Sequence, residues 1–224
     1  MRNQNPRICL LSVGSKRTRT AGFSMIELVV VVAIMMILAV LVVPNIFSSK
    51  RLYQSETQSL MIMDLLREAS QQAMNQRRTF RVEIDLTDNA LLLIDERNSD
   101  PDEMVKSIPL ASPSDIRLDS APDGVDGPTP PDYNDITFIN DETGHDRNGT
   151  SVSGHNVWAA RFQRDGTVVN NAGNPISATI YVWPPAAPES AEPRAATEVR
   201  AITMFGGSGA VRYWKYDGST FLPY

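Results

Sequence analysis

The sequence predicts an α+β fold in which one long N-terminal helix packs on a mainly antiparallel β domain. Three observations support this prediction. Residues 23–43 form one apolar run, residues 44–77 continue it with an amphipathic helical period, and residues 78–224 contain segments that alternate in twos between turn-forming residues. A chain of 224 residues is long enough for one such domain and an anchor.

Charge is distributed unevenly along the chain. The segment 1–22 has no acidic side chain and five basic ones: Arg2, Arg7, Lys16, Arg17 and Arg19. The remainder has a net charge of about −10 and lacks the clustered Lys and Arg that phosphate binding requires, so we expect no nucleic-acid partner. Cys9 is the only cysteine, which excludes an internal disulfide and a thiolate metal site from residues 23–224.

The apolar run 23–43 predicts a transmembrane helix. Such a helix spans about 32 Å, against a hydrocarbon core of about 30 Å. The basic segment before it predicts a cytoplasmic N-terminus and an extracytoplasmic C-terminal part. A secretory signal peptide has a shorter apolar stretch and an A-x-A-like cleavage site. A plain anchor explains the length and orientation but leaves Glu27, the only ionisable side chain in the run, unexplained.

The residues around Glu27 resemble the N-terminal signature of type IV prepilins and pseudopilins. The sequence Gly22-Phe23-Ser24-Met25-Ile26-Glu27 follows a basic leader and precedes the apolar run and Pro44. The resemblance implies that a prepilin peptidase removes the leader 1–22 by cutting after Gly22 and that the new N-terminal residue, Phe23, is N-methylated. Glu27 then becomes the fifth residue of the mature chain, and Pro44 becomes the twenty-second.

A carboxylate inside a membrane is costly and usually has a partner. Cleavage after Gly22 creates an amine on Phe23, and we expect this amine to pair with Glu27 of the same or a neighbouring subunit. The pair would set the register between subunits, so we interpret Glu27 as an assembly residue. Pro44 predicts a bend in the helix because it removes an amide donor and crowds the preceding turn.

Residues 44–77 are predicted to continue the helix with one buried face. Apolar positions recur there at intervals near three, four or seven: Tyr53, Leu60, Met63, Leu66, Ala69 and Ala73. We interpret Met61, Met63 and Met74 as core residues, not as a binding stripe.

Strands are predicted in the domain 78–224. A hairpin joins 79–86 to 91–94 across the turn 87–89. Further strands are expected at 136–139, 157–163, 167–169, 179–183, 199–205 and 211–216. Two stretches, 112–135 and 184–193, are rich in Pro, Asp, Ala and Ser, so we expect exposed loops there.

Within the prepilin-like family, this layout is most similar to the H-type minor pseudopilin of type II secretion and its type IV pilus counterpart, the GspH/FimT class. Three segments show the similarity, 65–84, 161–167 and 200–211, whereas the two loops and the end of the chain after residue 212 depart from it. A disulfide-closed major pilin is disfavoured by the absence of cysteine after the leader. A major pseudopilin is disfavoured because residues 141–149 lack the regular spacing of calcium ligands.

Catalytic chemistry has few candidates in this sequence. The two histidines, His145 and His155, have no recognised metal-ligand spacing. We interpret both as surface residues and expect no metal, cofactor or catalytic residue. The glycine-rich segment 206–210 lies between two predicted strands, so we interpret it as a hairpin turn and not as a nucleophile elbow.

We therefore predict a non-enzymatic minor pilin or pseudopilin of a type II secretion or type IV pilus-like filament. It would be a single-pass protein of the inner (cytoplasmic) membrane, with prepilin peptidase, other pilin subunits, the inner-membrane assembly platform and membrane lipid as partners. The alternative is an anchored or filament-carried binding or adhesion protein that recognises an exported substrate or a surface. Exposed aromatic side chains would favour this alternative, and the candidates are Trp158, Trp183, Trp214 and Tyr213.

Overall fold

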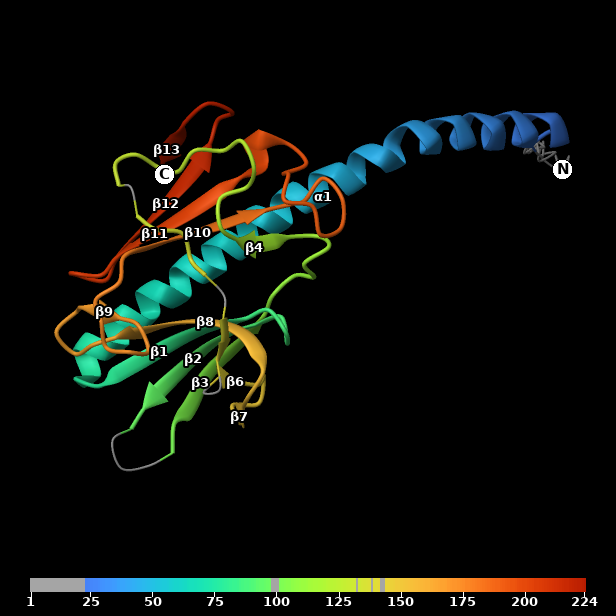
Figure 1. Ribbon diagram of the computed structural model, residues 1–224. Coiled ribbons are helices and arrows are strands. Elements are labelled where there is room, and N and C mark those ends of the chain that lie inside the picture. Colours follow the sequence, from blue (N-terminus) through green and yellow to red (C-terminus); the bar gives the residue numbers. More distant parts are fainter. Residues whose placement is uncertain (1–22, 98–100, 132, 138, 142–143) are drawn as a thin grey trace, which may run out of the picture. The chain divides into compact units, whose positions relative to one another are not determined.

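The structure, a computed structural model, describes residues 23–97, 101–131, 133–137, 139–141 and 144–224 (Figure 1). For residues 40–52 and 139–141 it describes the backbone only. The chain divides into two compact units, Met1–Asn45 and Ile46–Tyr224. The predicted leader 1–22, including the cleavage position Gly22, lies outside the described residues.

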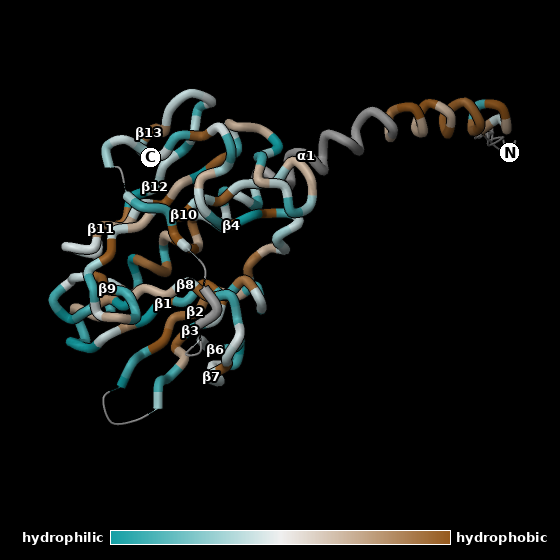
Figure 2. The backbone as a smooth tube through the Cα atoms, viewed as in Figure 1, coloured by the Kyte–Doolittle hydropathy of each residue, from teal (hydrophilic) through white to brown (hydrophobic). Residues whose placement is uncertain are grey.

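Helix α1, Met25–Gln76, contributes to both units. In the first unit every described side chain from Phe23 to Ala39 is exposed, and Figure 2 shows that this stretch is almost entirely hydrophobic. Pro44 lies within α1, and its side chain is outside the described part. The predicted span 23–43 likewise extends beyond the described side chains. Among the residues that are described, no helix is long and apolar enough to cross a membrane.

In the second unit one face of α1 is buried. Its apolar members belong to the main hydrophobic core: Ile62, Met63, Leu65, Leu66, Ala69 and Ala73. Of the methionines expected in the core, Met63 is buried, whereas Met61 and Met74 are exposed. The expectation was therefore wrong for Met61 and Met74.

The buried face of α1 also differs from the predicted one near residue 55. Tyr53 and Leu60 were expected in it and are 69% and 37% exposed. Ser55 and Ser59 are buried in their place. The Ser55 hydroxyl lies 3.4 Å from each of two backbone carbonyl oxygens of the β part, and the Ser59 hydroxyl donates to the Ser55 carbonyl at 2.7 Å. A hydrophobic period misses these positions because buried hydroxyls are satisfied by backbone acceptors.

The first sheet has the strand order β3-β2-β1-β8-β5, and β9 pairs with β8. Its strands are β1 Thr79–Asp85, β2 Ala90–Glu96, β3 Glu103–Pro109, β5 Ile139–Asp141, β8 His155–Phe162 and β9 Val168–Val169. In β1, Phe80, Val82 and Ile84 join the main core with α1. Because side chains alternate along a strand, Arg81, Glu83 and Asp85 point to the opposite face of the sheet.

The second sheet has the order β13-β12-β11-β10-β4. Its strands are β4 Arg117–Asp119, β10 Ala178–Trp183, β11 Arg200–Phe205, β12 Ala210–Tyr216 and β13 Phe221–Pro223, and the 3₁₀ helix η1, Ala196–Glu198, precedes β11. One face joins the main core, and the other face has a separate core around Tyr181, Trp183 and Trp214. A small third sheet pairs β6, Gly144–His145, with β7, Ser151–Val152.

The expected α+β class with mainly antiparallel sheets is confirmed, since all strand pairs among the described residues are antiparallel. The hairpin 79–94 and the strands near 157–163, 167–169, 179–183, 199–205 and 211–216 are present. Two expectations were wrong. The strand expected at 136–139 is replaced by β5, which begins at Ile139, and the loop expected at 112–135 contains β4.

Candidate functional site: the N-terminal helix and its carboxylate

Phe23 and Ser24 precede the first turn of α1 and are not helical. The Phe23 side chain is 81% exposed. The amide of Leu28 donates to the carbonyl oxygen of Ser24 at 3.2 Å, which closes the first turn of the helix. Phe23 therefore precedes the helix and is exposed.

Glu27 lies in the first turn of α1, and its side chain is exposed. It has no hydrogen bond or ion pair with another described residue. A negative side chain is favourable in a first helical turn because the amides there are unpaired and the helix dipole is positive at that end. The positive end of the helix dipole thus stabilises the Glu27 carboxylate, but no described residue neutralises its charge.

The side chains around Glu27 form an exposed apolar surface. From Met25 to Leu38 the exposed large hydrophobic residues include Ile26, Met35 and Met36. Soluble monomers rarely expose contiguous apolar surface on this scale, and such a surface marks contact with a membrane or with another protein. The combination of a carboxylate that has no partner among the described residues and a continuous apolar surface indicates a segment that contacts another molecule.

The comparisons with known proteins address this segment. Residues 17–43 match the model of the prokaryotic N-terminal methylation motif. The chain carries a type IV prepilin-like motif. No curated protein and no solved structure gives a significant match to the chain.

The motif supports a type IV pilin-like or pseudopilin subunit, and it implies processing by prepilin peptidase and assembly with other pilins. It includes Phe23 and Glu27 together with the end of the basic leader. Proteins with this motif are structural subunits. The β-rich part of the chain lies outside the match, so the finer resemblance to the H-type class depends on the sequence alone.

The aromatic residues that would favour the binding-protein alternative are not at the surface. Trp158, Trp183, Trp214 and Tyr213 are all buried. Trp158 and Tyr213 belong to the main core, and the other two pack on the outer face of the second sheet. In the described part of the chain they therefore contribute to packing. The segment 206–210 joins β11 to β12, as expected of a hairpin turn.

Both histidines differ from the expectation of simple surface residues. His145 is buried, and its backbone amide donates to Glu83 Oε2 at 2.9 Å. Its Nδ1 lies 3.0 Å from Arg81 Nη2 and 3.2 Å from Glu83 Oε1. Arg81 Nε also lies 2.9 Å from Glu83 Oε1. His145 thus completes a buried charged cluster on the outer face of β1.

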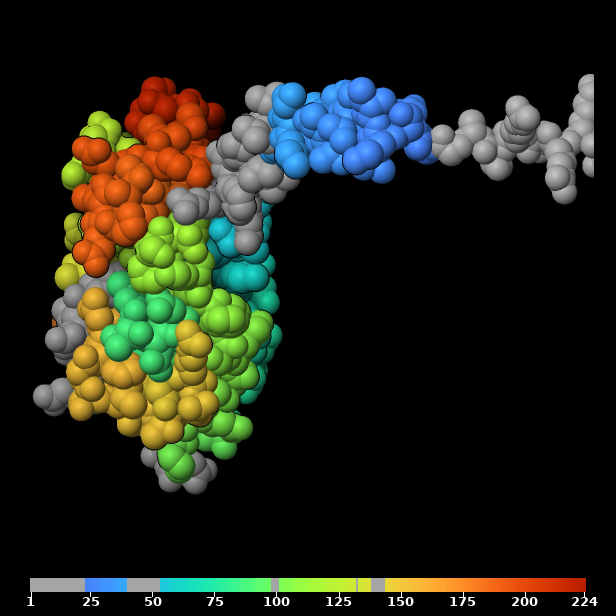
Figure 3. Space-filling view, turned by 90° about the vertical axis from the view of Figure 1, so that its right-hand side faces the viewer, coloured from blue at the N-terminus to red at the C-terminus, as the bar shows by residue number. Residues whose placement is uncertain are grey.

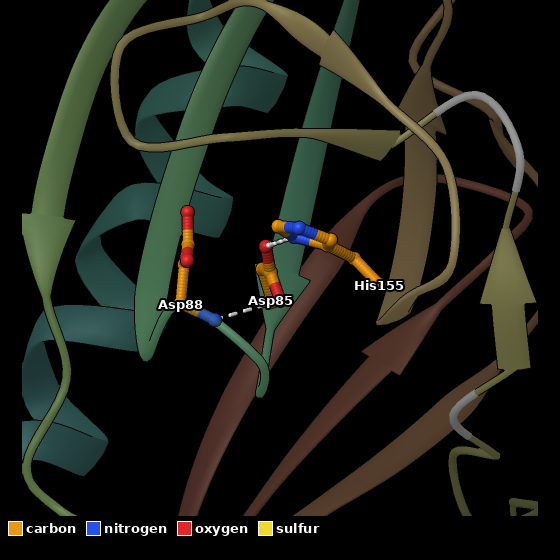
Figure 4. Close-up of side chains that lie close together, drawn as sticks. All are labelled: Asp85, Asp88 and His155. Atoms are coloured by element: carbon orange, nitrogen blue, oxygen red, sulfur yellow. Dashed lines mark hydrogen bonds and ion pairs between the residues drawn. The ribbon is translucent and has the colours of Figure 1, made fainter.

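His155 is partly buried and pairs with Asp85, the next residue along the same face of β1. Its Nδ1 lies 2.6 Å from Asp85 Oδ2, and this hydrogen bond raises the pKa of His155 above its usual value. Figure 4 shows the two side chains facing each other beside Asp88. One feature of the sequence could have indicated the contacts of both histidines: Arg81, Glu83 and Asp85 share one face of an otherwise apolar strand.

Proposed function

We propose that this protein is a minor pilin or pseudopilin subunit of a type II secretion or type IV pilus-like filament. The methylation motif at residues 17–43 is the observation that carries the proposal. The exposed apolar start of α1 supports it, because a subunit of such a filament needs an accessible helix for contact with lipid and with neighbouring helices.

Processing is the first step of the proposal. Prepilin peptidase cuts between Gly22 and Phe23 and removes the leader 1–22, and Phe23 is then N-methylated. Cleavage requires an accessible backbone, and the exposure of Phe23 outside the first helical turn supports this position. A glycine on the leader side admits close approach of the peptidase because it has no side chain.

Residence in the inner membrane is the second step. Residues 23–43 would act as a single-pass anchor, with the basic leader in the cytoplasm and the domain 78–224 outside the cytoplasmic membrane. The distribution of basic residues supports this orientation. Pro44 follows this segment and would allow the helix to bend where it continues into 44–77.

Assembly is the third step, and Glu27 is its central residue. The α-amine of Phe23 exists only after cleavage, and its pairing with Glu27 of a neighbouring subunit would neutralise a carboxylate that is otherwise costly in lipid. Because the pair forms at one relative height of the two helices, it would also set their register. The inner-membrane assembly platform would supply the incoming subunits.

The H-type minor class is the finer form of this proposal. It is supported by the resemblance of segments 65–84, 161–167 and 200–211, which include parts of β1, β8, β11 and β12. A minor subunit initiates or modifies a filament and is present in few copies. Adhesion or substrate binding remains the alternative role for the β domain.

Mass spectrometry of the membrane-extracted protein tests the processing step. We expect a mature chain that begins at methylated Phe23, and we expect Gly22→Leu to leave the precursor uncut because the added side chain obstructs the cleft. A chain that still begins at Met1 in a host with active prepilin peptidase would refute the proposal.

Crosslinking between subunits tests the assembly step. Glu27→Ala should be processed and retained in the membrane but should lose crosslinks to neighbouring subunits, and Glu27→Gln should show an intermediate defect because it keeps polarity without charge. Asp64→Ala is the matched control, since Asp64 is an exposed acidic residue of the same helix that has no ion pair with another described residue. Equal crosslinking of Glu27→Ala and Asp64→Ala would show that Glu27 has no role in assembly.

A further inference from the structure

A group of potential metal ligands lies at one end of the first sheet. Asp85 ends β1, Asp88 lies in the turn that leads to β2, and His155 begins β8. One ligand atom from each of the three residues lies within 4.8 Å of the others. In Figure 3 the β1–β2 turn (mint green) borders the segment near residue 150 (gold) at the surface of the second unit. This site is remote in the sequence from the methylation motif, and the inference does not depend on the proposed function.

Backbone contacts fix the position of the first ligand. Asp85 is fully buried, and its Oδ1 accepts the amide hydrogens of Thr87 at 2.7 Å and Asp88 at 3.2 Å. These bonds hold the turn and leave Oδ2 facing His155 Nδ1 at 2.6 Å. Two potential metal-ligand atoms, an oxygen of Asp85 in β1 and a nitrogen of His155 in β8, are thus already in contact (Figure 4).

The charge around the imidazole is strongly negative. Asp85, Asp88 and Asp146 all act on His155 electrostatically. The guanidinium of Arg147 contacts backbone carbonyls of this turn: Nε donates to the carbonyl of Asp88 at 2.6 Å and Nη2 to the carbonyl of Asn89 at 3.3 Å. Only its backbone amide, at 3.4 Å, approaches the Asp88 carboxylate. Asp85 pairs with His155, but among the described residues neither Asp85 nor Asp88 has an ion pair with a lysine or arginine side chain.

We propose that Asp85, Asp88 and His155 bind a divalent transition-metal ion of the zinc class. Imidazole nitrogen and carboxylate oxygen are ligands of zinc, with bond lengths of about 2.0–2.2 Å. Ligand atoms around a tetrahedral ion with such bonds lie roughly 3.4 Å apart. Asp85 Oδ2 and His155 Nδ1, which lie 2.6 Å apart, have to separate by about 0.8 Å, and the wider separations, which are at most 4.8 Å, have to contract by about 1.4 Å or less. Asp88, half-buried in the turn, is the ligand that moves to close the wider gaps.

The ligand set also selects among metals. Calcium prefers six to eight oxygen ligands, and magnesium requires an octahedron of oxygen atoms. One nitrogen and two carboxylates suit zinc and its neighbours in the first transition row better. Three protein ligands leave a fourth position open for water or for a ligand from another molecule. The metal takes the place of the proton shared by Asp85 and His155, so binding releases a proton wherever His155 is charged.

Isothermal titration tests the site. The full-length protein in detergent is first stripped with a chelator and then titrated with zinc chloride alone. We expect one zinc ion per chain, and we expect Asp88→Asn and His155→Ala to weaken binding by at least roughly tenfold. Asp165→Asn is the matched control, because Asp165 also holds a turn through its Oδ1, which accepts from Thr167, but no histidine contacts it.

The two histidines give a second measurement that does not depend on the variants folding equally well. In NMR spectra of the wild-type chain, zinc should shift the imidazole resonances of His155, while those of His145 stay in place because Arg81 and Glu83 already occupy its Nδ1. Absence of binding, shifts confined to His145, or binding unchanged in both Asp88→Asn and His155→Ala would overturn the proposal.

Discussion

Replacement of Leu66 by alanine tests whether the second half of α1 is an integral part of the β domain. Leu66 is 0% exposed and belongs to the same core as strands of both large sheets. Leucine-to-alanine changes in such cores cost about 3–5 kcal/mol, because they remove buried carbon atoms and leave a cavity. Leu60→Ala on the same helix is the control. Leu60 is partly exposed, so we expect a cost of about 1 kcal/mol or less.

Thermal unfolding in detergent measures this difference. For a domain of this size each kcal/mol lowers the melting temperature by about 2–4 °C. Leu66→Ala should therefore lower it by roughly 6–20 °C and Leu60→Ala by less than about 4 °C. Tryptophan fluorescence is a suitable signal because Trp158, Trp183 and Trp214 all lie in the β part of the chain. Equal shifts for the two variants would show that α1 does not pack on the sheets as described.

Three further predictions concern the second unit. Burial raises the pKa of Tyr213 to about 12. The stability that the neutral Tyr213 hydroxyl contributes is therefore complete below about pH 10 and is lost between about pH 10 and 12. Urea midpoints should fall over this range in the wild type and fall less in Tyr213→Phe. Gly209 has a φ of 64°, and an added Cβ would lie 2.8 Å from a side-chain oxygen. Gly209→Ala should therefore lower the free energy of unfolding, measured with denaturant, by about 1–2 kcal/mol. Gly207→Ala, whose added Cβ meets only a movable ring, should lower it less. Glu83→Gln removes the nearest counter-charge of the buried Arg81, while Glu96 and Asp102 stay within 3.2 Å of it. The change should therefore lower the free energy of unfolding by about 1–2 kcal/mol; an unchanged midpoint would refute this role.

The sequence was sufficient for the elements whose side chains alternate between the core and the outer face. Strands β1, β8 and β10 to β12 have one face in the main core, so hydrophobic periodicity was informative. Strand β3 was not predicted because it is an edge strand with few buried side chains, and edge strands need no hydrophobic alternation. Strands β4 and β13 have three residues each, too few for a period.

The candidate functional sites also differ in how much of them the sequence predicts. Phe23 and Glu27 could be named as candidates from the sequence because the motif is local and its spacing is fixed, and their roles stay predictions. The contacts of His145 and His155 were missed because their partners, Glu83 and Asp85, lie 62 and 70 residues away. Only the pairing of β1 with β8 and the placement of β6 bring these residues together. The charged face of β1 was visible in the sequence, but no local pattern indicated which residues would cover it.

The locations of the hydrophobic cores have a consequence for how this chain can change. All buried members of the three core clusters lie between Ile62 and Tyr216. None of them lies in residues 23–39, the part of the motif whose side chains the structure describes. Substitutions within residues 23–39 that change how this segment recognises its neighbours therefore remove no contact of these cores, and repacking of the β domain changes none of these residues. The sequence of the N-terminal segment and the packing of the β domain can therefore diverge independently, so that one kind of N-terminal segment can accompany very different domains.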